Sequence, residues 1–140
     1  MISKKTTEEI AILKAGGAIL AKILKELTKV AVVGNTTLDI DDKAMELAEK
    51  YGVEPILLGY HPDFAPRPYP AAVCVSTNHC VQHGIPSTEV VFKEGDVVNI
   101  DMSIAYKGLV VDSGLTVGVG EISDISRKLI AATQEALAVG

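Results

Sequence analysis

The sequence predicts an α+β fold in which an antiparallel sheet is backed by helices. Residues 96–106 and 109–117 alternate between apolar and polar or small side chains, which is the period of a half-exposed strand. Lys107 and Gly108 between them are typical of a tight hairpin turn, because glycine adopts positive φ freely. Two long stretches earlier in the chain carry apolar residues at helical spacing. These helices are the simplest cover for the apolar face of the hairpin.

Composition bounds the class of protein. The chain has 140 residues, enough for one domain with a hydrophobic core, and its 48% hydrophobic and 22% charged content is ordinary for a globular protein. A net charge of -5 argues against an extended nucleic-acid footprint. The sequence shows no apolar run of ~18 residues and no signal peptide. We therefore expect a soluble, cytoplasmic protein with neither a nucleic-acid nor a membrane partner.

The predicted hairpin brings two aspartates onto one face. With Lys107 and Gly108 as the whole turn, Ser103 lies opposite Asp112. Asp101 then lies on the same face as Asp112, diagonally across the two strands. Diagonal Cβ atoms in such a pair are roughly 6–8 Å apart, within reach of a shared ligand. The other side chains on this face are small, so space is left beside the carboxylates.

Two carboxylates in this position allow several interpretations. Carboxylate oxygens suit divalent cations, and bridging carboxylates suit a pair of metals about 3.5–4 Å apart. Both aspartates could equally lie on a solvated sheet face, or form a general acid and base pair as in a glycosidase. Two carboxylates so close would raise a pKa unless a cation neutralised them. The residues alone leave these alternatives open.

Helix boundaries are predicted by capping residues and glycines. The first helix begins near Thr6, where Thr6 and Glu9 match a capping box, and ends at Gly34. The second runs from Thr36 to Gly52, and the last begins near Ser123. Inside the first helix, two successive glycines at positions 16 and 17 predict the close approach of another segment.

Shorter elements fill the middle of the chain. Residues 55–60 and 71–78 are predicted strands, the second because of its alternation. Residues 61–70 hold four of the six prolines, so we predict an ordered loop there. Residues 79–86 form a second loop with turn residues at Gly84 and Pro86. Cys74 and Cys80, the only cysteines, do not have the spacing of a zinc motif.

Three segments, taken in order, resemble a known family. They are Tyr69–Asn78, His83–Pro86 (His-Gly-Ile-Pro) and Glu94–Asp101 (Glu-Gly-Asp-Val-Val-Asn-Ile-Asp). Together they resemble the type I methionine aminopeptidases over most of the chain. Each segment alone would be a weak signal, but their combination and order are specific.

The resemblance implies a pita-bread fold, in which two similar halves of antiparallel strands and helices enclose a dinuclear metal site. Residues that match Asp101 and Asp112 are bridging ligands in that family. The remaining ligands, one histidine and two glutamates, come from its second half. The implied cofactors are two divalent metal ions, of cobalt, manganese, iron or zinc.

The same resemblance assigns roles around the substrate. It implies that His83 is catalytic, contacting the substrate and assisting cleavage of the amide. It also implies that Tyr60, Tyr69 and Cys74 line the pocket for a methionine side chain, which apolar, aromatic and thiol groups accommodate well. The implied activity is removal of the N-terminal methionine from nascent polypeptides by a protein that is monomeric at full length.

Some positions depart from the family pattern. Ser113 and Gly114 follow Asp112 where the family usually has threonine and serine, and His79 replaces an acidic residue. The loop at residues 61–68 is longer than in many members. These changes remove no ligand that the resemblance implies, but they alter the hydroxyl groups next to Asp112 that would orient such ligands.

Length is the largest departure. We interpret residues 1–140 as the N-terminal half of a pita-bread aminopeptidase domain, with the second half absent, because the last ten residues are apolar and helical without a polar end. We expect this half alone to be inactive and to self-associate. The alternatives are a non-catalytic pita-bread binding module and a half-domain that homodimerises and shares an aspartate site.

Overall fold

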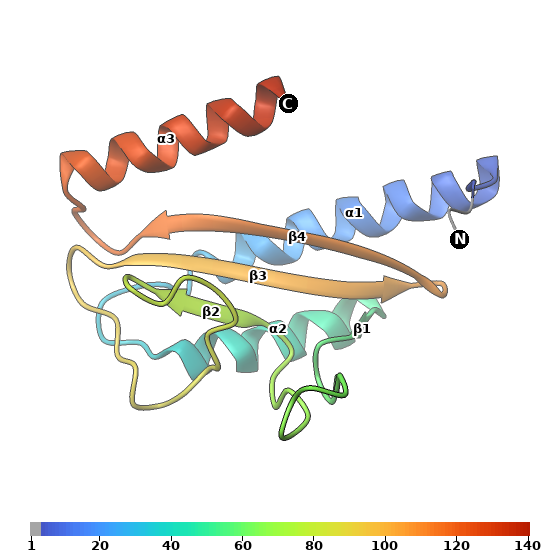
Figure 1. The fold of residues 1–140 in the computed structure, drawn as a ribbon, viewed down its shortest axis with the longest axis horizontal. Helices are drawn as coiled ribbons and strands as arrows, with labels where there is room; N and C mark the ends of the chain where they lie inside the picture. The colour runs from blue at the N-terminus through green and yellow to red at the C-terminus, as the bar shows by residue number, and fades with distance from the viewer. Residues whose placement is uncertain (1–3) are drawn as a thin grey trace.

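The computed structural model describes residues 4–140 as one sheet with three helices (Figure 1). None of the helices in this part of the chain is long and apolar enough to cross a membrane. The elements, in chain order, are α1 (Thr7–Leu27), α2 (Thr37–Tyr51), β1 (Glu54–Pro55), β2 (Cys74–Thr77), β3 (Val97–Tyr106), β4 (Leu109–Gly118) and α3 (Asp124–Val139).

Strand β3 is the centre of the sheet, and every pairing in the sheet is antiparallel. One edge of β3 pairs along its whole length with β4. The other edge pairs with β2 near the start of β3 and with β1 near its end. Residues from β2, β3 and β4 therefore lie side by side on each face.

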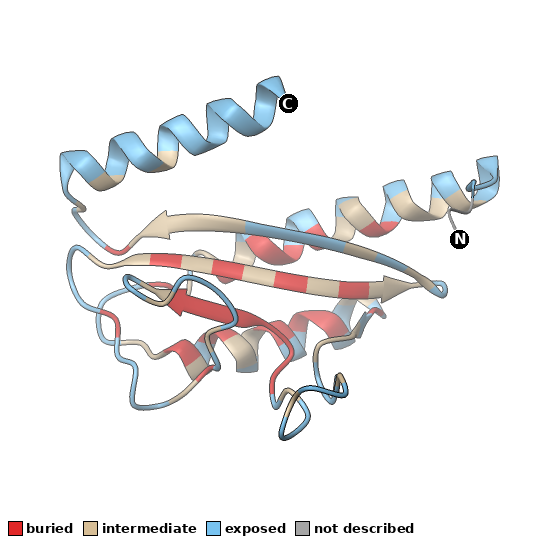
Figure 2. Ribbon diagram, in the orientation of Figure 1, coloured by how far each residue is buried: buried red, intermediate tan, exposed pale blue. Residues whose placement is uncertain are grey.

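The core lies between the sheet and the first two helices. Figure 1 shows α1 and α2 on the same side of the sheet, and Figure 2 shows buried residues alternating along β3 and following the inner sides of these helices. On β3 the buried residues are Val98, Ile100, Met102 and Ile104. The predicted cover of the apolar hairpin face by helices is confirmed, and the partly buried residues of β3 lie on the opposite face.

The predicted helix starts are confirmed at both capping boxes. Thr6 accepts from the Glu9 amide while the Glu9 carboxylate accepts from the Thr6 amide, and Thr36 and Asp39 do the same at α2. The stop at Gly52 is also confirmed, with φ of 64° at the C-cap.

The predicted end of the first helix at Gly34 is wrong, because α1 ends at Leu27. β-branched residues follow at Val30, Val32 and Val33, and these fit a helix less well. The Gly34 amide instead donates to the Phe92 carbonyl, which ties this segment to a distant loop.

The shorter predicted strands are correct in place and wrong in extent. The segment predicted at 55–60 starts one residue earlier and ends at Pro55, because the chain turns where the Tyr60 amide donates to the Leu57 carbonyl. The segment predicted at 71–78 contributes only Cys74–Thr77 to the sheet. Just before it, the Ala72 amide donates to the Asp41 carboxylate of α2 (2.8 Å) rather than to a strand.

The predicted close approach at the paired glycines is confirmed at Gly16. A Cβ atom at this position would lie 3.3 Å from the Tyr106 Cβ and 3.4 Å from a Val111 methyl group. At Gly17 a Cβ atom would meet nothing within 4 Å. Gly16 therefore allows α1 to pack closely on the hairpin.

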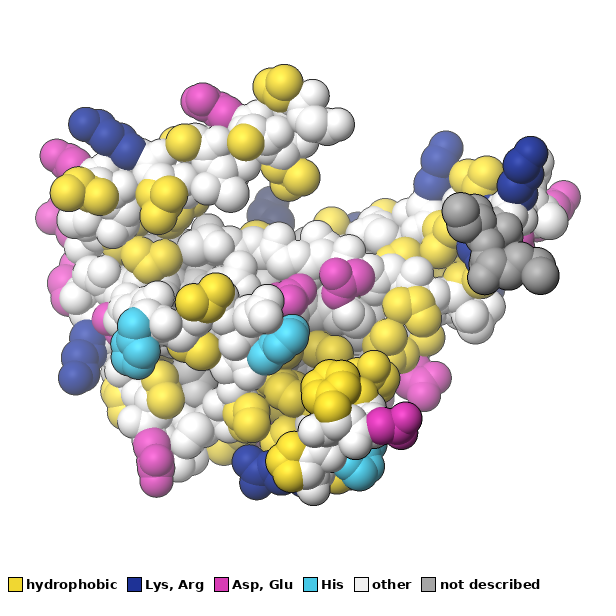
Figure 3. All heavy atoms as spheres, viewed as in Figure 1, with side chains coloured by type: hydrophobic (Ala, Val, Ile, Leu, Met, Phe, Trp, Pro, Cys, Tyr) yellow, Lys and Arg dark blue, Asp and Glu magenta, His cyan; other side chains and the backbone are white. Residues whose placement is uncertain are grey.

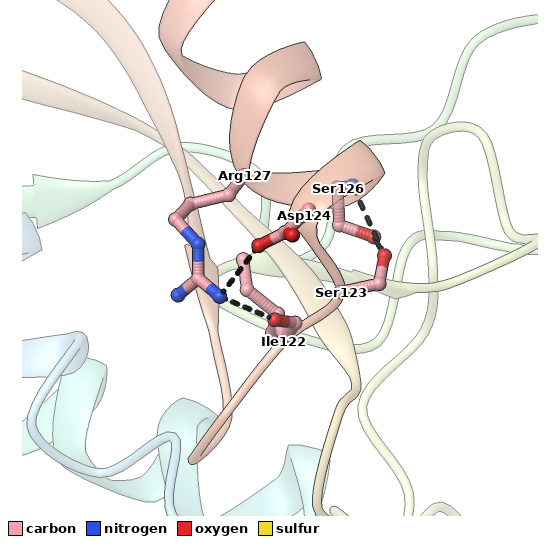
Figure 4. Close-up of polar contacts among 5 residues, drawn as sticks. All are labelled: Ile122, Ser123, Asp124, Ser126 and Arg127. Atoms are coloured by element: carbon pink, nitrogen blue, oxygen red, sulfur yellow. Dashed lines mark hydrogen bonds and ion pairs between the residues drawn. The ribbon is translucent and has the colours of Figure 1, made fainter.

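Helix α3 stands apart from the rest of the molecule and has no buried residue. Its start is fixed by local polar contacts (Figure 4): the Ser123 hydroxyl caps the Ser126 amide, and Arg127 donates to the Ile122 carbonyl (2.9 Å) and contacts Asp124. Its apolar side chains face solvent, with Ile125 80% and Leu137 83% exposed.

Candidate metal and substrate site

The two aspartates lie where the hairpin rule places them. Asp101 pairs with Gly114 and Ser103 pairs with Asp112, so both carboxylates are on one face of adjacent antiparallel strands. This is the face of β3 that alternates with its fully buried residues, and so it points away from α1 and α2. The predicted geometry of the pair is confirmed.

Small neighbours shape the space beside the carboxylates. A Cβ atom at Gly114 would lie 3.2 Å from the Asp101 Oδ1, so glycine leaves this oxygen open. On the other side, the Ser103 hydroxyl donates a hydrogen bond to the Asp112 Oδ1. Asp112 thereby has a fixed orientation, which is what a ligating carboxylate needs.

Electrostatics favour a cation at this position. Partial burial, and secondly the neighbouring Asp112 carboxylate, raise the pKa of Asp101, while His83 acts in the opposite direction. A cation bound to both carboxylates would relieve their repulsion. Figure 3 shows acidic and histidine side chains close together near the centre of this face.

Asp101 and Asp112 alone supply few metal donors. In the part of the chain that the structure describes, no cluster of three or more histidine, cysteine, aspartate or glutamate side chains is placed to hold a metal. Asp101 and Asp112 fit a divalent ion by their chemistry, their shared face and the room left by Gly114. They would leave most coordination positions to other donors.

His83 lies on a loop that is attached to the edge of β2. Its backbone has a φ of 56°, and the next residue, Gly84, accepts from the Val75 amide (2.9 Å) and donates to the Ser76 hydroxyl (3.1 Å). A Cβ atom at Gly84 would overlap the Val75 carbonyl oxygen. Glycine at position 84 is therefore required for the loop to lie flat on β2 and to hold His83 near Asp101.

Tyr69 and Cys74 connect this loop to the aspartate pair. Cys74 lies directly opposite Asp101 in the β2–β3 pairing, and the Tyr69 hydroxyl donates to the Gly84 carbonyl (2.9 Å). Burial raises the pKa of the Cys74 thiol, and burial beside Cys74 raises the pKa of Tyr69 well above its usual range. Both groups thus stay neutral and form an uncharged wall next to the carboxylates.

Tyr60 is brought to the same wall by its backbone, but its ring is open to solvent. The Tyr69 amide donates to the Tyr60 carbonyl (2.8 Å), so the two tyrosines are neighbours. The Tyr60 side chain is 59% exposed, whereas Tyr69 is half-buried and Cys74 is buried. The structure therefore brings Tyr69, Cys74, His83 and Asp101 together more closely than Tyr60.

A groove of about 730 Å³ continues this face toward α3. Gly114, Thr116 and Asn99 form its floor on the hairpin, and Leu129 and Leu137 of α3 form its opposite side. Its lining is mainly apolar, and Figure 3 shows the hollow beneath α3. Large open apolar surfaces of this kind are unusual on a stable monomer.

Two contacts were not identified from the sequence. The pairing rule put Ser103 opposite Asp112, and a hydroxyl opposite a carboxylate is the signal that would have predicted their hydrogen bond. The bond between Ser76 and the Gly84 amide joins segments whose meeting no local pattern indicates.

Comparisons with known proteins identify the family of the chain. Residues 11–140 match metallopeptidase family M24. A methionine aminopeptidase from Aquifex aeolicus is 42% identical over 129 residues, covering 92% of this chain and 50% of that protein. Methionine aminopeptidase 1 from Mycobacterium tuberculosis is 36% identical over 140 residues and is also half covered. The resemblance predicted from the motifs is confirmed.

Solved structures show the same fold. The crystal structure of methionine aminopeptidase from Thermotoga maritima superimposes with a TM-score of 0.90 at 39% identity, covering 99% of this chain and 53% of that one. A prolidase from Pyrococcus furiosus shares the fold, with a TM-score of 0.75 at 24% identity. The predicted pita-bread fold is confirmed, and the chain spans about half the length of the methionine aminopeptidases that it matches. With residues 11–140 matched, the chain belongs to metallopeptidase family M24.

Proposed function

We propose that the full-length protein is a metal-dependent methionine aminopeptidase of the cytoplasm and that residues 1–140 are the N-terminal half of its pita-bread domain. The observation that carries the proposal is the placement of Asp101 and Asp112 on one face, next to the neutral wall of Tyr69 and Cys74 and the loop of His83. Relatives that share this segment are named methionine aminopeptidases.

Asp101 and Asp112 are the proposed metal ligands of this half. When bound there, a pair of divalent ions such as cobalt, manganese, iron or zinc supplies a water of lowered pKa and polarises a carbonyl group. The second half would contribute the histidine and two glutamates that the family resemblance implies. Ser103 orients the Asp112 carboxylate for this role.

His83 is the proposed catalytic residue of this half. Its loop is held against β2 by the bonds of Gly84, and its imidazole is near enough to Asp101 to act on the pKa of that carboxyl, which supports the proposal. An imidazole in this position can donate a hydrogen bond to the substrate near the scissile amide, and it can give or accept a proton there.

Tyr60, Tyr69 and Cys74 are proposed to receive the side chain of an N-terminal methionine. The neutral thiol and phenol offer polarizable, uncharged surface, which suits a thioether better than a charged side chain. The substrate class would be the N-terminus of nascent polypeptides, and the full-length protein would act as a monomer.

The test uses the full-length protein, stripped of metal and then reloaded with manganese or cobalt. Release of methionine from Met-Ala-Ser should require the metal, and Asp101→Asn should abolish both metal uptake and turnover. Asp42→Asn, which changes an exposed carboxylate on α2, is the matched control and should alter neither. An Asp101→Asn variant that keeps its metal and its activity would contradict the proposal.

A further inference from the structure

The loop between β1 and β2 presents an aromatic ring to solvent. Phe64 is 90% exposed, and Tyr60 and Leu58 on the same connection are 59% and 46% exposed. An aromatic ring as open as that of Phe64 provides apolar surface that a bound molecule can cover. The tip of this loop therefore offers an apolar contact surface.

The loop has a defined shape. The Ala65 amide donates to the Pro62 carbonyl (2.9 Å), and the His61 Nε2 lies 3.0 Å from the Ala65 carbonyl oxygen. The backbone of Phe64 is therefore part of a compact turn. Prolines at positions 62, 66 and 68 further limit the backbone. An aromatic ring held on a restricted backbone loses little conformational entropy when it binds.

The base of the loop belongs to the proposed substrate site. The Gly59 amide donates to the Tyr69 carbonyl, and the Tyr69 amide donates to the Tyr60 carbonyl (both 2.8 Å), which closes the loop. Tyr69 then contacts the Gly84 carbonyl beside His83. If Tyr60 and Tyr69 receive the methionine as proposed, Phe64 belongs to the loop that leads away from this first pocket.

The charges around Phe64 indicate which kind of side chain the loop would contact. The opposite charges of Asp63 and Arg67 offset each other near the exposed ring, so this loop has no basic cluster to bind phosphates. The surface suits an uncharged, apolar side chain. A peptide that is bound by its first residue at Tyr69 and Cys74 would carry its later side chains past this wall.

We propose that Phe64 is a substrate-positioning residue that contacts an apolar side chain of the polypeptide downstream of its N-terminal methionine. This inference rests on the proposed function, because it needs the methionine to be held at the wall of Tyr60, Tyr69 and Cys74. It makes the protein selective for the sequence that follows the first residues as well as for methionine itself.

The test compares three peptides on the metal-loaded full-length protein: Met-Ala-Ser, Met-Ala-Ser-Ser-Gly and Met-Ala-Ser-Leu-Gly. The wild-type protein should show a KM for the leucine peptide about fivefold lower than for the serine peptide, as expected for one good apolar contact. Phe64→Ala should remove this difference and leave Met-Ala-Ser unchanged. Phe64→Leu should keep part of it, and Val33→Ala, on the distant loop after α1, should keep all of it.

Several results would overturn the inference. Loss of activity toward all three peptides alike would make Phe64 part of the methionine pocket instead. An unchanged leucine preference would show that the ring does not touch the substrate, and a lowered melting temperature of Phe64→Ala would show that it packs within the protein. No turnover of any methionine peptide by the wild-type protein would reject the proposed function, and this inference with it.

Discussion

The Ser103 hydroxyl donates a hydrogen bond to the Asp112 carboxylate from the opposite strand of the hairpin. Ser103→Ala would free this carboxylate to rotate, and we expect about a tenfold loss of manganese affinity in the full-length protein, as for other groups that orient ligands. Isothermal titration calorimetry with manganese measures this affinity. Thr116→Val is the matched control. It removes a hydroxyl on the same face that accepts a hydrogen bond from the Asn99 side-chain amide, and it should change the manganese affinity little.

Residues 1–140 alone should bind manganese or cobalt weakly, with a dissociation constant no tighter than roughly 0.1 mM, because two carboxylates supply few of the ligands that such ions need. The affinity should fall further as the pH drops through the raised pKa of Asp101, since protons compete for the carboxylate. Hydrolysis of Met-Ala-Ser should be undetectable. Turnover by this chain that Asp101→Asn abolishes would contradict the expectation.

Gly84→Ala should displace the His83 loop, because the added Cβ atom would overlap the Val75 carbonyl oxygen. We expect a loss of roughly 2–3 kcal/mol of stability, typical of steric strain together with broken buried hydrogen bonds. Ser76→Ala removes only the bond to the Gly84 amide and should cost about 1 kcal/mol. Urea unfolding followed by circular dichroism compares the two, and equal small effects would show that the loop moves freely.

The adjacent glycines of α1 should respond to alanine in opposite ways. Gly17→Ala should stabilise the protein by about 0.5–1 kcal/mol, because its Cβ atom enters open space and alanine favours the helix. Gly16→Ala should lose that gain or reverse it, since its Cβ atom crowds Tyr106 and Val111. Thermal melts of the two variants under one condition decide the matter, and a shared sign would mean that the contact at Gly16 is loose.

The exposed apolar side of α3 should make residues 1–140 self-associate. Ile125, Leu129 and Leu137 are all more than half exposed beside an open groove, and we expect the second half, supplied in trans, to cover them. Leu129→Glu together with Leu137→Glu should reduce the association. Sedimentation measures it; a monomer whose melting temperature does not depend on concentration would show that this half is a finished domain.

Much of the fold was predictable because local chemistry decides it. The hairpin follows from alternation and the turn at Lys107 and Gly108, and its register placed Asp101 and Asp112 correctly. Helix starts were equally clear, because the side chains of Thr6 and Thr36 satisfy backbone amides that the helix itself leaves free.

The failures occurred where distant segments decide the structure. The end of α1 was misplaced because Val30, Val32 and Val33 prolong an apolar stretch, while Gly34 is held by Phe92, far away in the sequence. Strand β2 was predicted too long because the amide of Ala72 is taken by Asp41 of a helix. The contact of Gly84 with β2 likewise depends on two segments meeting, so no periodicity indicates it.

The turn between β4 and α3 controls where the far end of the helix lies. Gly118 packs against Ile122, the Glu94 carboxylate bonds the Glu121 amide, and Gly120 has φ of 61°, so the direction of the helix is set at one end only. A helix of 16 residues is about 24 Å long, so a rotation of roughly 10° at the turn moves its far end by about 4 Å. Substitutions at Gly118 or Gly120 would thus shift whatever rests on α3 relative to Asp101 and Asp112, without touching either carboxylate.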